Sequence, residues 1–248
     1  MPAQINGPKL EPLEWDSNFF GFGVGRLTAA GVNEVREGIL EAQKNRLRLL
    51  YWAIPSTAEV AINSRLTVQR YVGDQLTHTL QPLAAEKLRD SDNFTVTTHA
   101  NKNATPELIE LAVGAGWKSR FNIDPDIPHQ NFVELYTTWI QNSCSGAFAD
   151  KVYTAFNEQS KLMGFITVKK RKNRATVGLL AVSSEHRRQG VGRSLIQRAK
   201  CFALQQGCAS LSVGTQATNT GANTLYSKEG FVVERSESWF HLWVSKTT

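Results

Sequence analysis

The chain has 248 residues, of which 41% are hydrophobic and 20% charged, and this composition excludes an acidic, disordered protein. A net charge of +6 does not by itself indicate nucleic acid binding, because its distribution is uneven. Residues 1–90 carry ten basic and ten acidic side chains, whereas residues 161–200 carry eleven basic residues against one acid, Glu185. The length allows one large domain or two smaller ones.

No apolar run approaches the ~20 residues that a membrane span needs. The N-terminus lacks a basic region followed by an apolar stretch, so no secretory signal is expected. The cysteines Cys144, Cys201 and Cys208 lack metal-ligand spacing, and we expect reduced thiols. We therefore expect a cytoplasmic protein with no metal and no membrane partner.

The first ninety residues predict a small α/β domain. Strands are expected at 22–28, 47–54 and 75–80, and helices at 32–45 and 57–71. The polar stretch 85–93 follows as a junction, so the predicted domains are 1–90 and 91–248.

The second domain is predicted to alternate strands and helices. Strands are expected at 94–98, 151–157, 162–170, 175–182, 210–215 and 231–244, and helices at 105–114, 131–142, 190–206 and 220–229. Thr105 should cap the first of these helices and Gly230 should end the last. The segment 121–129, rich in Pro and Asp, is expected to be a loop. This order favours a mixed sheet with helices on both faces.

The segment between the strand 175–182 and the helix that follows it is suited to an anion. It reads Arg187, Arg188, Gln189, Gly190, Val191, Gly192, Arg193 and Ser194. Two glycines two positions apart allow a tight turn with N–H groups in one concavity, and the helix N-terminus adds its positive dipole. Guanidinium groups match phosphate geometry. These residues therefore predict a phosphate site.

A simple strand–helix turn with solvated arginines is the alternative interpretation of this segment. The spacing matches neither the P-loop nor the dinucleotide fingerprint. The preceding strand, the amphipathic helix and the three arginines together favour the phosphate site over the simple turn.

The segments VGLLAVSSEHRRQGVGRSLI and TQATNTGANTLYSKEGF resemble motifs A and B of the GCN5-related N-acetyltransferases, the GNAT superfamily. The resemblance implies a GNAT fold, which is a mixed, mostly antiparallel α/β sheet flanked by helices. It also implies that acetyl-CoA is the cosubstrate and that its pyrophosphate lies at the phosphate site. The smaller α/β domain would precede this fold.

A narrower resemblance covers nearly the whole chain. LEPLEWDSNFFG, Ser119-Arg120-Phe121, YTTWIQNS, GLLA and ESWFHLW are similar to segments of the dTDP-fucosamine acetyltransferases. This group acetylates the 4-amine of dTDP-4-amino-4,6-dideoxygalactose for surface polysaccharide. The chain departs from the group in its longer first domain and its Asp/Pro-rich segment 121–129, so the identity of the sugar stays open.

Acetyl transfer to an amine needs a positioned thioester, a neutral amine, oxyanion stabilisation and a proton for the thiolate. The strand end at Leu180, Ala181 and Val182 is placed to align the pantetheine arm, with a backbone N–H near Leu180 or Ala181 on the acetyl carbonyl. Asn219 and Tyr226 lie seven residues apart, on one helix face. Asn219 would hold the coenzyme, and the resemblance implies that Tyr226 protonates the sulfur. The alternative is a packed tyrosine.

No general base is evident in the sequence. Glu158, Glu185, His129 and Glu134 are candidates on chemistry alone, but each fits a surface or capping role, and a chain of water molecules is an equal alternative.

For the acceptor we expect Arg120, Tyr136 and Trp139 from the second domain, with Trp15, Phe19 and Phe20 from the first. Aromatic faces can stack on thymine, and Arg120 can meet a diphosphate. Such aromatic residues also form cores, which is the competing interpretation.

Three other functions were weighed against this one. They are an acetyltransferase for another small amine, a non-catalytic acetyl-CoA-binding module and nucleic-acid binding through the basic hairpin at residues 169–174. The hairpin has few aromatic residues nearby and is expected to be solvated, so no nucleic-acid partner is expected. The alternating final strand is a candidate surface for a homodimer.

Overall fold

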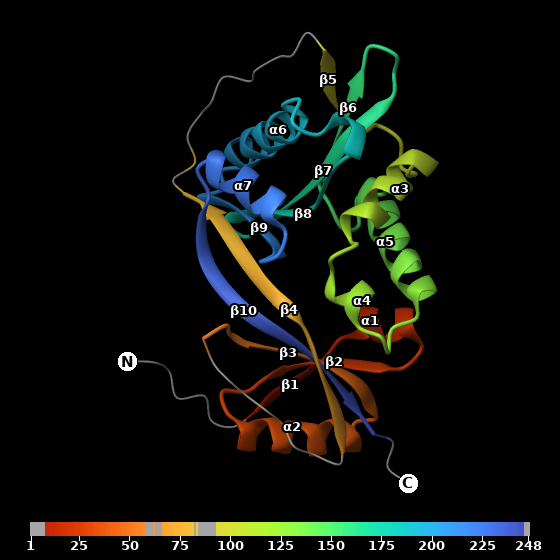
Figure 1. The fold of residues 1–248 in the computed structure, drawn as a ribbon, viewed down its shortest axis with the longest axis vertical. Coiled ribbons are helices and arrows are strands. Elements are labelled where there is room, and N and C mark those ends of the chain that lie inside the picture. Colours follow the sequence, from red (N-terminus) through yellow and green to blue (C-terminus); the bar gives the residue numbers. More distant parts are fainter. Residues whose placement is uncertain (1–7, 58–61, 63–65, 82, 84–92, 246–248) are drawn as a thin grey trace. The chain divides into compact units, whose positions relative to one another are not determined.

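The computed structural model describes residues 8–57, 62, 66–81, 83 and 93–245, and it has a mixed α/β fold with helices flanking a large sheet (Figure 1). The elements are β1 (Lys9–Pro12), α1 (Glu14–Phe20), β2 (Gly23–Thr28), α2 (Val32–Lys44), β3 (Leu47–Pro55), β4 (Thr67–Leu80), β5 (Phe94–Thr98), α3 (Pro106–Ala115), α4 (Arg120–Ile123), α5 (His129–Cys144), β6 (Lys151–Asn157), β7 (Leu162–Arg171), β8 (Arg174–Val182), η1 (Ser184–His186), α6 (Val191–Gln205), β9 (Ser210–Gln216), α7 (Thr220–Lys228) and β10 (Val232–Val244).

The chain divides into two compact units that do not follow chain order. The first unit is Met1–Gln75, Ile123–Asp126 and Ser236–Thr248, and the second is Leu76–Asn122 and Ile127–Arg235. β4 and β10 therefore each contribute residues to both units. The domain boundary predicted at residue 90 lies outside the described residues and stays a prediction.

The first unit has the strand order β1-β2-β3-β10-β4. β2 and β3 run parallel and are joined by α2, whereas β1 pairs with β2 and β10 with β3 in antiparallel fashion. The helix packs on one face of these strands, where Val35 and Ile39 meet Leu50, Trp52 and Phe240 in a buried core. The indole N–H of Trp52 donates to the carbonyl of Ala29, so this buried polar atom is satisfied.

The alternation of β3 and β10 places Tyr51 and His241 among the residues outside that core. His241 Nδ1 lies 2.6 Å from Asp124 Oδ2, and the Trp243 indole donates to the same oxygen at 3.0 Å. His241 and Asp124 are both fully buried, and the ring of Tyr51 lies 5.1 Å from that of His241. These contacts attach the short segment Ile123–Asp126 to the first unit.

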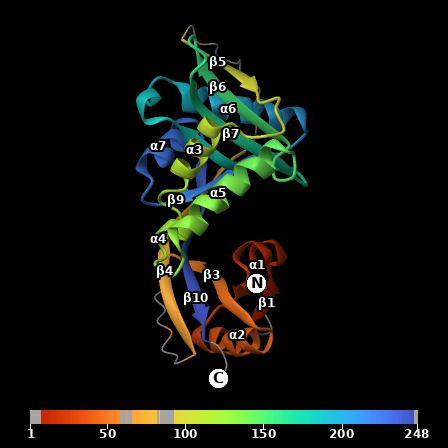
Figure 2. The same ribbon diagram turned by 90° about the vertical axis from the view of Figure 1, so that its right-hand side faces the viewer.

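The second unit has the strand order β4-β9-β8-β7-β6-β5. β5 to β8 pair antiparallel and β8 pairs with β9 in parallel. Two helices, α6 and α7, lie on one face and α3 and α5 on the other (Figures 1 and 2). The second unit has a hydrophobic core on each face of its sheet, and alternate residues of β7 point to one or the other. Ile166 and Val168 pack with α6, whereas Phe165 packs with α3 and α5. The predicted mixed sheet with helices on both faces is confirmed for this unit.

Three local predictions were wrong. The helix predicted at 57–71 fails at Thr67–Tyr71, where β4 begins, and most of its earlier residues lie outside the described ranges. The loop predicted at 121–129 begins inside the short helix α4 and ends at the first residue of α5. No element was predicted before residue 22, where β1 and α1 lie. Local pattern fails in such places because packing with distant residues decides the conformation.

Candidate functional site

The turn before α6 leaves the start of this helix open. Gly190 has φ of 88°, in the left-handed region that favours glycine, and stands at the N-cap without a side-chain cap. The first helical bond runs from the amide of Ser194 to the carbonyl of Gly190, at 3.0 Å. The amides of Val191, Gly192 and Arg193 thus have no partner in the preceding turn of helix, and this is the arrangement that binds anions.

The arginines beside this turn have different partners. Arg187 and Arg188 are exposed, and no carboxylate pairs with either among the described residues. Arg193 instead forms an ion pair of 3.1 Å with the buried carboxylate of Glu229, which also accepts from Lys200 at 3.3 Å. Two of the three arginines are therefore available to an anion, and the third is tied to the end of α7.

The second glycine of the turn allows close packing of two helices and a strand. A Cβ on Gly192 would lie 3.1 Å from a methyl carbon of Leu225 on α7 and 3.7 Å from one of Val182 on β8. The absent side chain therefore lets the start of α6 approach both elements. The phosphate loop, the end of β8 and α7 are therefore neighbours in the second unit.

β8 and β9 separate next to this turn. Their parallel pairing runs from Arg174–Ser210 to Val177–Val213, although β8 continues to Val182. A bulge accompanies the separation: Thr167 of β7 faces two residues of β8, and its hydroxyl accepts from the amide of Leu179 at 2.9 Å.

Beyond Val177, β8 pairs only with β7 among the described residues. Leu180 pairs with Ile166, Ala181 with Phe165 and Val182 with Gly164. The other edge of this stretch is therefore open to an extended ligand, which is where the sequence predicts the pantetheine arm.

Tyr226 lies in the core of the second unit, with 3% of its surface exposed. Its ring centroid is 5.3 Å from that of His78 and 5.8 Å from that of Phe231. Burial raises the pKa of its hydroxyl well above the ordinary value for tyrosine. The hydroxyl forms no hydrogen bond with the described residues, and it is not one of the fully enclosed side-chain atoms that lack a partner, so this proton donor is open to a ligand.

Asn219 stands at the N-cap of α7. Its side-chain oxygen accepts from the amide of Ala222 at 3.4 Å, and its amide group donates to the Thr215 hydroxyl at 3.2 Å. These bonds give Asn219 a capping function in this structure. Its predicted contact with the coenzyme stays a prediction.

Sequence reasoning missed two polar residues next to Tyr226. His78 on β4 is 3% exposed and its Nε2 lies 2.9 Å from Oδ1 of Asn223 on α7. His78 stands 148 positions before Tyr226 in a strand without a motif, so no sequence signal joins the two residues.

The predicted acceptor residues fall into two groups, one in each unit. In the second unit, the rings of Tyr136 and Trp139 lie 4.9 Å apart, and the Arg120 guanidinium lies 4.6 Å from the ring of Phe121. Burial raises the pKa of Tyr136, and the charge of Arg120 acts against this rise. The structure therefore brings Arg120, Tyr136 and Trp139 into one aromatic cluster.

In the first unit, Trp15 stacks on Phe19 at 5.5 Å, and Phe19 and Phe20 meet edge to face at 4.9 Å. All three residues belong to α1 and none is fully buried. Ser17 and Gly21 fix this helix, because the Ser17 hydroxyl accepts from the amide of Val24 at 2.9 Å and Gly21 ends the helix with φ of 70°. Ser17 and Gly21 of the LEWDSNFFG segment thus serve the local fold.

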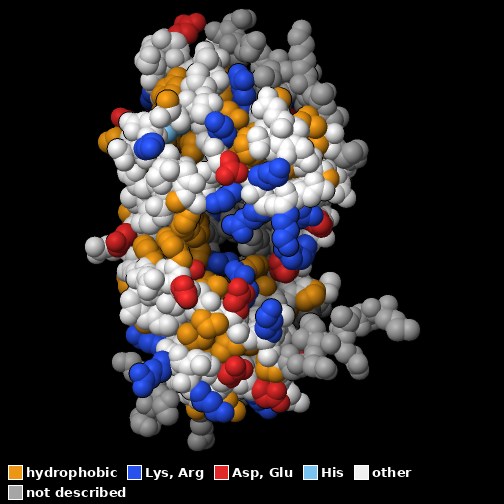
Figure 3. Space-filling model, turned by 180° about the vertical axis from the view of Figure 1, so that it is seen from behind, with side chains coloured by type: hydrophobic (Ala, Val, Ile, Leu, Met, Phe, Trp, Pro, Cys, Tyr) orange, Lys and Arg blue, Asp and Glu red, His pale blue; other side chains and the backbone are white. Residues whose placement is uncertain are grey.

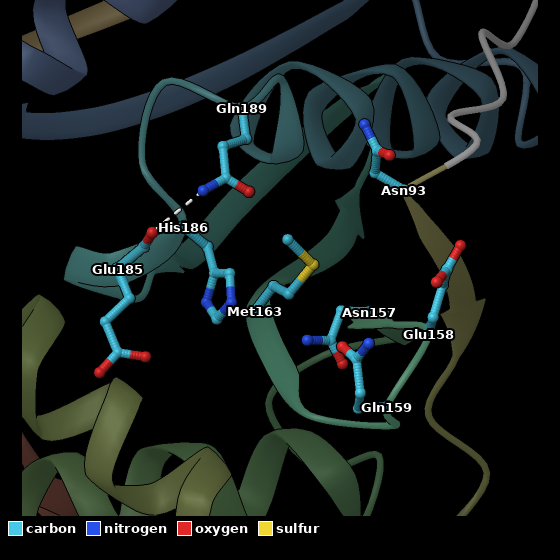
Figure 4. A pocket seen from close by; sticks show the side chains of 8 residues that line it. All are labelled: Asn93, Asn157, Glu158, Gln159, Met163, Glu185, His186 and Gln189. Atoms are coloured by element: carbon cyan, nitrogen blue, oxygen red, sulfur yellow. Dashed lines mark hydrogen bonds between the residues drawn. The ribbon is translucent and has the colours of Figure 1, made fainter.

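The four candidate bases, Glu158, Glu185, His129 and Glu134, are all exposed. Two of them, Glu158 and Glu185, line a polar pocket of about 370 Å³ that borders the phosphate loop at Gln189 (Figure 4). The pocket is lined by Asn93, Asn157, Glu158, Gln159, Met163, Glu185, His186 and Gln189. Glu185 pairs with Lys161, which lowers the pKa of this carboxyl and makes it a weaker base. None of the four has the buried position that tunes a base toward neutral pH.

Several basic side chains of the hairpin between β7 and β8 form hydrogen bonds or ion pairs with other residues of the second unit. Lys169 and Lys170 donate to the carbonyls of Ala147 and Gln206, each at 2.7 Å. Arg174 holds Glu234 through two bonds of 3.0 Å, which lower the pKa of that carboxyl. On the face in Figure 3, basic and acidic side chains occur together and hydrophobic ones form separate small groups.

Within the described ranges, no helix combines the length and the apolar character that a membrane span requires. In the same part of the chain, no three His, Cys, Asp or Glu side chains gather as metal ligands would.

Comparison with known sequences gives a family and two informative relatives. Residues 117–231 match the Acetyltransferase (GNAT) family. The chain is 27% identical to dTDP-fucosamine acetyltransferase of Escherichia coli O6:H1 over 97% of its own length and the full length of that protein. It is 25% identical to spore coat polysaccharide biosynthesis protein SpsD of Bacillus subtilis, over 57% of this chain and 48% of that protein.

Comparison with solved structures supports the same fold. A GCN5-related N-acetyltransferase from Sphaerobacter thermophilus superposes with a TM-score of 0.59 over 97% of this chain and 78% of that one, at 11% identity. A tandem GNAT protein from the clavulanic acid biosynthesis pathway gives a TM-score of 0.58 over 91% of this chain and 76% of that one, at 12% identity. At these identities the likeness concerns the fold alone.

Proposed function

We propose, from the match of residues 117–231 to the Acetyltransferase (GNAT) family, that the protein acetylates the 4-amino group of a dTDP-4-amino-4,6-dideoxyhexose. The acetyl group comes from acetyl-CoA, and the product serves surface polysaccharide biosynthesis. The acceptor that we propose within this class is dTDP-fucosamine, which is dTDP-4-amino-4,6-dideoxygalactose.

One observation carries the choice of substrate. The similarity to the E. coli dTDP-fucosamine acetyltransferase covers the complete length of that protein, including the first ninety residues that lie outside the family match. An acetyltransferase for an unrelated amine shares the catalytic domain without needing the same first domain. A second relative, SpsD, is named for spore coat polysaccharide biosynthesis, which supports a product used in polysaccharide synthesis.

The coenzyme is held by the residues around the start of α6. Its pyrophosphate would accept hydrogen bonds from the amides of Val191, Gly192 and Arg193, with Gln189, Gly190 and Ser194 beside them, and the exposed Arg187 and Arg188 add charge. Arg193 contributes to the field of this site although it is paired with Glu229. The pantetheine arm lies along the open edge of Leu180, Ala181 and Val182, and Asn219 lies next to it.

The reaction is a direct attack of the neutral amine on the thioester carbon. A backbone N–H near Leu180 or Ala181 stabilises the oxyanion, and Tyr226 gives its hydroxyl proton to the sulfur as the C–S bond breaks. The absence of a partner on the Tyr226 hydroxyl supports this assignment, because a hydroxyl bonded to a protein carbonyl would be committed elsewhere.

The acceptor is bound by Arg120, Tyr136 and Trp139 of the second unit and by Trp15 and Phe20 of the first. Arg120 meets the diphosphate and the aromatic faces take the thymine and the sugar. The role of the first unit is therefore recognition of the acceptor. The net charge of zero over residues 1–90 fits this role better than it fits binding of the coenzyme phosphates.

The test is release of free thiol from acetyl-CoA across a panel of purified amines. The panel contains dTDP-4-amino-4,6-dideoxy sugars, the same amino sugars without the nucleotide, and an amine antibiotic. We expect turnover with the nucleotide sugars and more than about tenfold lower kcat/KM without the nucleotide. Turnover confined to non-nucleotide amines would favour the alternative, a GNAT enzyme for another small amine. No turnover with any amine, combined with tight acetyl-CoA binding, would favour a non-catalytic binding module.

A further inference from the structure

The imidazole of His78 has a defined tautomer, because its neighbour Asn223 has a fixed amide orientation. The side-chain N–H₂ of Asn223 donates to the carbonyls of Gln216 at 3.3 Å and Ala217 at 3.0 Å. Its Oδ1 therefore faces His78 and can only accept. The Nε2 of His78, 2.9 Å away, must then be the nitrogen that carries the hydrogen.

The second nitrogen of His78 is consequently a bare acceptor when the ring is neutral. This Nδ1 atom is buried and has no hydrogen-bond partner among the described residues. An unsatisfied buried acceptor destabilises a fold, so its presence calls for a function. The ring lies against Tyr226, the residue to which we assign protonation of the sulfur.

Proton transfer from Tyr226 to the thiolate requires that another group return a proton to the Tyr226 oxygen. Burial raises the pKa of its hydroxyl far above that of a thiol, which is about 8.5. If Tyr226 gave its proton to the thiolate and stayed ionised, the strongly basic phenolate would have protonated a weaker base, the thiolate. This transfer is unfavourable by itself. The transfer becomes favourable when Tyr226 receives another proton in the same step. The acetylated amine releases such a proton.

We propose that His78 carries the proton from the acceptor amine to Tyr226. As the new N–C bond forms and the C–S bond breaks, the nitrogen loses one proton to Nδ1 of His78. Tyr226 gives its hydroxyl proton to the sulfur, and the His78 imidazolium returns a proton to the Tyr226 oxygen. Each group ends in its starting state, and the net change is one proton moved from nitrogen to sulfur.

The relay rests on the proposed function and supplies the base that the exposed carboxylates do not provide. No hydrogen bond joins His78 to Tyr226 in this structure, and the relay requires that Nδ1 of His78 reach the amine and the Tyr226 oxygen once the substrates are bound, since catalytic hydrogen bonds often tighten only then. Asn223 holds the imidazole in the tautomer that leaves Nδ1 free for the proton.

The decisive variant is His78→Gln. The glutamine amide can still donate to Asn223 but has no basic nitrogen, so a structural role and a proton-transfer role predict different results. We expect kcat to fall about a hundredfold or more, with the KM for acetyl-CoA and the Tm close to those of the wild type. A variant that keeps the wild-type kcat would overturn the inference, because the bond to Asn223 would then be what matters.

Rescue provides the second measurement. In His78→Ala, added imidazole should restore at least about a tenth of the lost activity in a saturable manner, because it can occupy the cavity that the substitution leaves. If the His78→Gln variant fails to fold, the rescue of His78→Ala tests whether His78 transfers a proton. Activity that does not depend on added imidazole would overturn the relay. If the wild-type enzyme acetylates no amine at all, the proposed function itself has failed.

Discussion

The environment of Tyr226 limits what its hydroxyl can do. The ring packs between His78 and Phe231, and the hydroxyl has no protein partner among the described residues. The ring is buried, but the hydroxyl is not one of the enclosed polar atoms that lack a partner, so a ligand can reach it. Tyr226 follows Leu225 in α7, and Leu225 packs against the start of α6, so its helix borders the phosphate turn, which supports a role at the thioester.

Replacing Tyr226 with Phe should separate chemistry from binding. The phenyl ring keeps the packing and removes only the proton, so kcat should fall by about 10²–10⁴-fold. The KM for acetyl-CoA should change less than about threefold, since no ground-state contact is lost. Thiol release measures both constants. Tyr153→Phe, a half-buried tyrosine of β6, is the control, and an unchanged kcat for Tyr226→Phe would remove Tyr226 from the mechanism.

A glycine sets the position of Tyr136 in the aromatic cluster of the second unit. A Cβ on Gly116 would overlap the ring of Tyr136, whereas one on Gly114 would meet nothing within 4 Å. Gly116→Ala should therefore overpack the cluster and cost about 1–3 kcal/mol of unfolding free energy. Gly114→Ala, in the exposed last turn of α3, should be neutral or stabilise by up to about 1 kcal/mol. Thermal unfolding of both variants checks this, and equal Tm values would contradict the packing.

At the scale of elements, the start of α6 and the hairpin between β7 and β8 offer a direct comparison. Both are exposed, basic turns, and each holds one non-glycine residue in the left-handed region, Arg188 with φ of 61° and Lys172 with φ of 55°. Only the first stands at a helix N-terminus. The dipole and free amides there, rather than charge alone, make it the anion site.

Removing two charges from each turn should have unequal effects. Arg187→Ala with Arg188→Ala should weaken acetyl-CoA binding by about 10–100-fold, since each charge-assisted bond contributes about 1 kcal/mol or slightly more at an exposed site. Arg171→Ala with Lys172→Ala removes the same charge and should change the Kd less than about threefold. Calorimetric titration of acetyl-CoA measures both. Equal losses would mean that net charge, not the turn, attracts the coenzyme.

Strand periodicity and caps predicted most elements of the second unit. Thr105 caps α3 as expected, its hydroxyl accepting from the amide of Leu108 at 3.3 Å. The first half of β4 was misjudged as a helix, because its apolar and polar residues do not alternate cleanly and its conformation depends on its neighbours in the sheet. Local sequence therefore predicted the elements around the phosphate loop better than those of the first unit.

The segment Ile123–Asp126 is held by Asp124, whose carboxylate makes stability depend on pH. Burial alone would raise the pKa of Asp124, but hydrogen bonds from His241, the Asp126 amide and Trp243 together lower it. A lowered folded-state pKa stabilises the fold above the ordinary value of about 3.9 and loses this contribution as pH falls through the folded pKa. The bonds are therefore strongest near neutral pH.

Asp124→Asn should remove this pH-dependent stabilisation. Near pH 7 the wild type should be more stable by about 1–3 kcal/mol. As pH falls below about 4 the difference should shrink toward zero, because Asp124 becomes protonated first in the unfolded state and then, at the lowered folded-state pKa, in the native state. Denaturant unfolding across pH measures the difference, and a gap that stays constant down to pH 3 would contradict the assignment.

For the whole molecule, the basic excess of residues 161–200 now has two explanations. Arg187 and Arg188 flank the proposed phosphate site, whereas Lys169, Lys170 and Arg174 bind carbonyls and a carboxylate of the second unit. The average charge of +6 concealed both roles. The second role could not be foreseen, because Glu234 and the two carbonyls come from distant parts of the chain.

The same distinction applies to the site as a whole. The phosphate turn and the Tyr226 helix are local motifs, so the sequence alone could predict them. The separation of β8 from β9, the pair Arg193–Glu229 and the approach of His78 to Tyr226 arise from contacts between distant residues. Chemistry that depends on such contacts needs the folded chain.

The most direct test of the account is the discrimination between the two sugar epimers. Thiol release gives kcat/KM for dTDP-4-amino-4,6-dideoxygalactose and for the corresponding glucose epimer under identical conditions. Because the amine must point at the thioester, inverting the carbon that bears it misplaces the nucleophile. We expect the galactose compound to be preferred by more than about tenfold. A ratio near one, or a preference for the glucose epimer, would contradict the substrate assignment.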